Sequence, residues 1–179
     1  MKPEYLLLHH DADSSPDPHF QKVNANHKNR GFPKSSLGFH VGYTWFCGKD
    51  GTLKQARAED EVGAHCSAKG MNFKSIGVCL AGNFTKEAPT AYQIESLTVL
   101  LDQLQQRWGI PDDKILLHRE VGKTACPGVD LRALYFAQRV QLLRKKLLMA
   151  ESALRHANGP RRNALTRKVD RLKRKIADV

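Results

Sequence analysis

Two short apolar runs, each followed at once by histidine, constrain the fold of this chain more than any other feature. Tyr5–Leu8 precedes His9 and His10, and Ile115–Leu117 precedes His118. Continuous apolar runs of this length are typical of strands that are buried on both faces of a sheet. In open α/β sheets, ligand-binding sites lie at the carboxyl ends of such strands, so we expect these histidines to lie beside a functional site.

Cys126 follows His118 by eight residues and indicates a zinc site. An imidazole and a thiolate suit Zn²⁺, whereas Mg²⁺ and Ca²⁺ prefer carboxylate and carbonyl oxygens. A third ligand would be His9 or His10, because a zinc site needs at least three protein ligands. Strand neighbours point to opposite faces, so only one of the two can join His118, and the pattern leaves open which. The alternative is a surface histidine and a cysteine packed as a small apolar residue.

Residues 1–137 alternate strand-like and helix-like segments. We expect a helix over His19–Asn29, a hairpin of Phe39–Cys47 with a run near Leu53, a central strand over Ser75–Leu80, and a helix from Thr90 to Trp108. This order predicts an α/β domain with one central sheet.

Residues 138–179 form a second region of different character. They contain 13 Lys or Arg and three acidic residues, a formal charge of +10, whereas residues 1–137 carry +1. Apolar residues recur at alternating steps of four and three on both sides of a turn at 158–160, which predicts a helical hairpin held by an apolar seam. The stripes are Phe136, Val140, Leu143, Leu147, Ala150 and Leu154, then Leu165, Val169, Leu172, Ile176 and Val179.

No signal peptide or membrane-spanning run is visible, so we expect synthesis in the cytoplasm. The four cysteines lack the spacing of a disulfide framework, which favours reduced thiols. They are Cys47, Cys66, Cys79 and Cys126.

Six pieces of the sequence match a known family in order and spacing: Leu7–His10, Val41–Tyr43, Asp50–Thr52, Val62–His65, Ser75–Leu80 and His118–Pro127. On these pieces, residues 5 to about 137 resemble the type-2 N-acetylmuramoyl-L-alanine amidases, which include bacteriophage lysozyme-type amidases and peptidoglycan recognition proteins. The resemblance implies a mixed β-sheet packed by helices, with one Zn²⁺ in a groove. It also implies hydrolysis of the amide bond between N-acetylmuramic acid and L-alanine in peptidoglycan.

The resemblance assigns the metal to His9, His118 and Cys126, and thereby selects His9 over His10. Three ligands leave a fourth zinc position for water, whose pKa falls to about 7 on the metal. Tyr43 and Thr124 take the family's catalytic positions. The Tyr43 hydroxyl would orient the zinc-bound water or hydrogen-bond the oxyanion, and Thr124 would act on the oxyanion side. Without the motif, Tyr43 would be read as a core aromatic residue.

His65 and Asn72 fall where the family lines its substrate groove, although each could equally be an exposed loop residue. Cys79 occupies the position of a catalytic glutamate in cytoplasmic recycling amidases, which favours the phage-lysozyme and recognition-protein branch. Glu120 and Lys123 are expected to be solvated charges.

The basic hairpin lies outside the resemblance. It is either a solvated extension or a region that binds anionic envelope polymers or a membrane surface, through Arg171, Lys173, Arg174 and Lys175. We expect a monomeric phage or prophage endolysin, bacteriolytic after release at lysis, with peptidoglycan as its partner and no stable nucleic-acid partner. The alternatives are a non-catalytic peptidoglycan-binding module, and a nucleic-acid- or protein-binding regulator acting through the tail.

Overall fold

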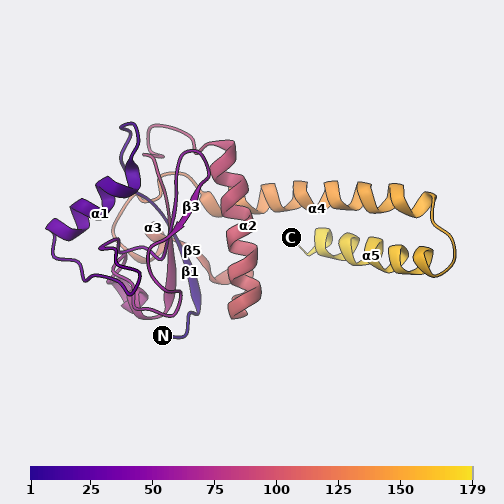
Figure 1. Ribbon diagram of the computed structural model, residues 1–179, viewed down its shortest axis with the longest axis horizontal. Helices are drawn as coiled ribbons and strands as arrows, with labels where there is room; N and C mark the ends of the chain where they lie inside the picture. Colours follow the sequence, from indigo (N-terminus) through magenta and orange to yellow (C-terminus); the bar gives the residue numbers. More distant parts are fainter. Residues whose placement is uncertain (179) are drawn as a thin grey trace. The chain divides into compact units, whose positions relative to one another are not determined.

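In the computed structural model, which describes residues 1–178, five strands form one sheet in the order β3-β2-β4-β1-β5 (Figure 1). The strands are β1 (Tyr5–His10), β2 (Trp45–Cys47), β3 (Leu53–Gln55), β4 (Ser75–Leu80) and β5 (Ile115–Leu117). β3 runs antiparallel to β2, and the other neighbouring pairs are parallel. The expected central mixed sheet of an α/β domain is therefore confirmed.

The two apolar runs that precede histidine form neighbouring strands of this sheet, with β5 at its edge. Leu8 of β1 pairs in register with Leu117 of β5. On the other side of β1, His9 pairs with Cys79 of β4. The parallel β1–β5 register consequently brings His9 and His118 to the same end of the sheet.

Helices complete the first compact unit, Met1–Arg132. They are α1 (His19–Asn29), α2 (Ala91–Trp108), α3 (His118–Val121), and the 3₁₀ segments Ala68–Phe73 and Asp112–Lys114. α1 spans the residues expected of it. At the start of α2, the Thr90 hydroxyl accepts a hydrogen bond from the Gln93 amide, and at its end Gly109 adopts a left-handed conformation with φ of 68°.

The strand predicted over Phe39–Cys47 is three times too long, because only Trp45–Cys47 form a strand of the sheet. Backbone amides earlier in this segment bind side chains instead of a neighbouring strand. The amide of His40 donates to Asn24 Oδ1, and that of Gly42 donates to His27 Nδ1. Side chains of α1 thus accept the hydrogen bonds of these two amides, and the segment forms a loop instead of a strand.

The second compact unit begins at Ala133 and contains the predicted helical hairpin. α4 (Leu131–Arg155) and α5 (Gly159–Ala177) are joined by residues 156–158. Ala150, Val169 and Leu172 are buried together, with Leu143, Leu147 and Leu154 packed against them. The apolar stripes form the expected seam between the helices; Val179 lies outside the described residues. Within residues 1–178, no helix is both long and apolar enough to cross a membrane.

Candidate metal centre

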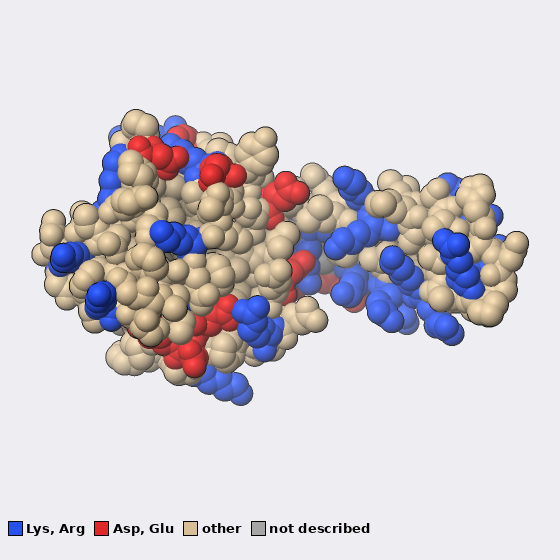
Figure 2. Space-filling view, viewed as in Figure 1, with Lys and Arg blue, Asp and Glu red and all other residues tan. Residues whose placement is uncertain are grey.

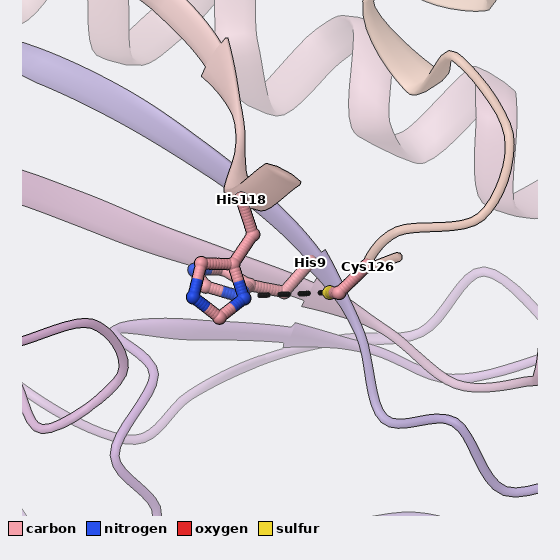
Figure 3. A group of neighbouring side chains, drawn as sticks. All are labelled: His9, His118 and Cys126. Atoms are coloured by element: carbon pink, nitrogen blue, oxygen red, sulfur yellow. Dashed lines mark hydrogen bonds between the residues drawn. The ribbon is translucent and has the colours of Figure 1, made fainter. Parts of the chain in front are cut away.

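Two imidazoles and one thiol converge at the end of the neighbouring strands β1 and β5 (Figure 3). One ligand atom from each of His9, His118 and Cys126 lies within 4.8 Å of the other two. His9 Nδ1 is 3.9 Å from Cys126 Sγ, and the ring centroids of His9 and His118 are 4.5 Å apart. The structure therefore brings together residues that are separated by more than a hundred positions.

Hydrogen bonds within the loop after α3 position the Cys126 thiol at the site. The Arg119 amide donates to the Cys126 carbonyl over 2.8 Å, and the Cys126 amide donates to Thr124 Oγ1 over 3.1 Å. The His10 amide also donates to Cys126 Sγ over 3.4 Å. Gly128 has a φ of 87°, and a Cβ there would lie 2.5 Å from the Phe84 carbonyl carbon, so this turn requires glycine.

The donor set fits zinc. With Zn–N of about 2.1 Å and Zn–S of about 2.3 Å, tetrahedral geometry separates nitrogen from sulfur by about 3.6 Å. His9 and Cys126 already stand 3.9 Å apart, so they need to move by only a few tenths of an ångström. Three such ligands leave one tetrahedral position to other molecules.

Burial sets the charge of the three groups. Burial lowers the pKa of His9 well below its usual value, and the neighbouring His65 and His118 lower it further. Burial likewise lowers the pKa of His118. Neutral imidazoles offer the lone pairs that a metal needs. Burial raises the pKa of the Cys126 thiol to about 11, a shift that a bound cation would oppose.

His65 contacts a ligand histidine, which the sequence did not reveal. His65 Nδ1 lies 3.2 Å from His9 Nε2, and His65 Nε2 lies 3.4 Å from the Ser75 carbonyl oxygen. With His9 Nδ1 turned to Cys126, the His9 Nε2–H donates to His65, whose own Nε2–H donates to Ser75. A Cβ on Gly77 would come within 2.6 Å of the His65 ring, so the His65 ring fits here only because residue 77 is glycine.

The residues expected to contact the substrate line one open groove together with His118. The groove passes His65 and Asn72 and reaches Arg30 and Phe32. Asn72 Oδ1 accepts hydrogen bonds from the amides of His65 and Cys66, at 2.9 and 2.8 Å. Asn72 therefore holds the loop that carries His65, and its oxygen is already engaged.

The two expected catalytic residues occupy different environments. Tyr43 is half-buried in the bend before β2, with its ring centroid 5.1 Å from that of His9. Burial raises its pKa well above 10, so the hydroxyl is protonated. Thr124 is exposed, and its hydroxyl accepts from the Cys126 amide. Both lie next to a candidate ligand.

Three further residues have clear structural partners. His10 points away from the centre and accepts a hydrogen bond from the Phe84 amide. Cys79 is fully buried and packs near Tyr43, and burial raises its pKa, so it is a neutral thiol. Glu120 is exposed, as expected of a solvated loop carboxylate, and it pairs with Arg132 at 2.8 Å.

Comparisons with known proteins agree with this fold. A family model described as N-acetylmuramoyl-L-alanine amidase matches residues 1–129. Peptidoglycan-recognition protein SC2 of Drosophila melanogaster is 32% identical over 129 residues, which cover 71% of this chain and 69% of that protein. The endolysin of Klebsiella phage KP32 is 32% identical over 117 residues, covering 63% and 71% of the two chains. The solved N-acetylmuramoyl-L-alanine amidase LysC from Clostridium intestinale URNW superposes with a TM-score of 0.59 at 32% identity, covering 70% and 76%.

The fold and the three converging donors define an α/β domain with a candidate mononuclear metal centre. The chain belongs to the N-acetylmuramoyl-L-alanine amidase family. The helical hairpin lies beyond the matched residues.

Proposed function

We propose that this protein is a zinc-dependent N-acetylmuramoyl-L-alanine amidase that cleaves the bond between N-acetylmuramic acid and L-alanine in peptidoglycan. The observation that carries the proposal is the convergence of His9, His118 and Cys126 beside an open groove. The family match and the endolysins among the relatives support the same reaction. We further propose an endolysin that acts on the cell wall after lysis, as a monomer.

His9, His118 and Cys126 would hold the zinc ion. When bound, zinc lowers the pKa of water to about 7 and polarises a carbonyl oxygen. Tyr43 stands beside His9 with a protonated hydroxyl, which can donate to the oxygen of the amide under attack. Thr124 Oγ1 accepts a hydrogen bond from the Cys126 amide. The hydroxyl proton of Thr124 is therefore free to be donated to the substrate.

Residues of the groove would orient the substrate beside the metal site. His65 fixes the ring of His9 through the contact between Nε2 and Nδ1, and its exposed edge lies in the groove with Asn72. We propose that these two residues border the bound stem peptide. The loop that carries them is held by the Asn72 oxygen, so the wall is preorganised before substrate arrives.

Binding without catalysis is the second candidate, because recognition proteins are among the relatives. The complete set of two imidazoles and a thiol favours hydrolysis. A purely scaffolding domain would have no need of a thiol turned toward His9.

The hairpin would bind the anionic cell envelope. Its formal charge of +10 contrasts with +1 for residues 1–137. Of the four residues expected to make this contact, Lys173 is paired with Glu151 at 3.3 Å, and Arg171, Arg174 and Lys175 are exposed. Figure 2 shows how Lys and Arg dominate the visible surface of the hairpin.

The reaction is tested by incubating the purified protein with peptidoglycan, with and without a chelator. We expect new L-alanine amino termini, no new reducing sugar ends, and loss of activity on chelation. Cys126→Ser should abolish release while wall binding persists. New reducing ends, or undiminished release by Cys126→Ser, would contradict the proposal.

A further inference from the structure

The two broad faces of the α4–α5 hairpin differ in charge. The buried seam of Ala150, Val169 and Leu172 defines the direction in which the helices face each other. At 100° per residue, side chains about a quarter turn to either side of the seam make up the broad faces. Residues opposite the seam form outward ridges. Helical periodicity therefore assigns each charged residue to a face.

One broad face is of mixed charge. The Glu151–Lys173 ion pair, at 3.3 Å, links the two helices there and identifies it. Arg144, Arg155 and Arg162 lie on the same side by periodicity. This face therefore carries four cations and one carboxylate, and that carboxylate is paired with Lys173.

The opposite broad face, which we name the Met149 face, has no acidic residue among the described residues assigned to it. It carries exposed Lys146 from α4 and exposed Arg161, Lys168 and Lys175 from α5. The three cations of α5 recur every seven residues, so they form a row about 21 Å long. The ridge of α5 opposite the seam is separate and contains Arg167, Arg171, Arg174 and Asp178.

An apolar side chain lies among these cations. Met149 is 67% exposed on this face, and Leu142, two α4 turns earlier, is half-buried. A dissolved polyanion such as nucleic acid or a wall polymer would neutralise the cations but leave Met149 in water. A bilayer with anionic headgroups offers phosphates to the cations and an apolar phase to Met149, while the lysine and arginine stems cover the boundary.

We propose that the Met149 face docks on the surface of an anionic phospholipid bilayer. This inference deepens the proposed envelope role of the hairpin and rests on it. The protein would lie on the membrane surface with Met149 in the headgroup boundary.

The test is cosedimentation of the full chain with vesicles of phosphatidylcholine, with and without phosphatidylglycerol. We expect binding only to the anionic vesicles, and weakening with added salt. Lys168→Glu with Lys175→Glu should reduce binding about tenfold or more, because each cation near the surface contributes separately. The matched control, Arg144→Glu with Arg155→Glu, changes net charge equally on the mixed face and should have less than about a twofold effect.

Met149→Ser and Leu148→Ser provide a second comparison, because both side chains are 67% exposed but point to different sides of α4. Only Met149→Ser should weaken vesicle binding, by about threefold or more. Thermal melts would confirm that every variant folds.

Equal losses in both charge-reversal pairs would overturn the inference, because net charge alone would then explain binding. Binding to isolated cell walls without binding to anionic vesicles would also overturn it, yet leave the envelope role intact. Cleavage of a soluble muramyl peptide, measured on the same variants, reports the proposed reaction separately. We expect that cleavage to be unchanged in all of them.

Discussion

At the residue scale, the candidate metal centre includes side chains that would not themselves bind the ion. His9 is held from two sides, by Cys126 Sγ at 3.9 Å and His65 Nδ1 at 3.2 Å. A ligand histidine fixed in this way has its tautomer and ring orientation set before the metal arrives. His65 thus has a structural role toward the site in addition to its place in the groove.

We predict that His65→Ala lowers zinc affinity by about 10- to 100-fold, the usual cost of losing a hydrogen-bond partner of a metal ligand. Competition with a chelating dye measures the affinity directly. Leu148→Ala, in the hairpin, is the control and should bind zinc like the parent protein. Unchanged affinity in His65→Ala would show that His9 needs no such support.

His27 should make the domain acid-sensitive. Burial first, and then Arg30 and Arg57, lower its pKa from 6.5 to about 4. Because the folded pKa lies below the unfolded one, the stabilisation is complete above pH 6.5 and is lost as the pH falls from 6.5 to 4. The shift corresponds to at most about 3 kcal/mol.

His27→Gln keeps an acceptor for the Gly42 amide but removes the titration. The free energy of unfolding, measured with urea, should therefore fall less between pH 7.5 and pH 4.5 in this variant than in the parent. An identical loss in both proteins would mean that His27 is not the group that titrates.

At the element scale, the hairpin seam should be the main source of stability of the second unit. Leu172 is 8% exposed, whereas Leu148 is 67% exposed. We predict that Leu172→Ala destabilises the hairpin by about 2–3 kcal/mol and that Leu148→Ala costs less than about 0.5 kcal/mol. Hydrogen exchange in α5 reports the difference, and equal protection in both variants would contradict the packing described here.

Periodicity in the sequence predicted these elements well, because it records burial directly. Ala91–Trp108 and the stripes of the hairpin follow it, and Ser75–Leu80 and Ile115–Leu117 follow from their apolar runs. Phe39–Thr44 misled the prediction, since its aromatic and β-branched residues resemble a strand. The amides of His40 and Gly42 are instead bound by side chains of α1, and no local pattern reports such contacts.

At the scale of the whole molecule, the chain combines an amidase-family domain with a basic hairpin that the family match does not include. The zinc ligands were assigned from motif order, and the structure shows that these residues meet. The contact between His65 and His9 depends on tertiary packing and could not be seen in the sequence.

The central claim is that His9, His118 and Cys126 hold one catalytic metal ion. The most direct test is the absorption spectrum of the Co²⁺-substituted protein, because a thiolate ligand produces an intense charge-transfer band. We predict one Co²⁺ per chain with this band, its loss in Cys126→Ser, and its retention in Cys66→Ser. A band that survives in Cys126→Ser, or no stoichiometric binding by the parent protein, would contradict the account.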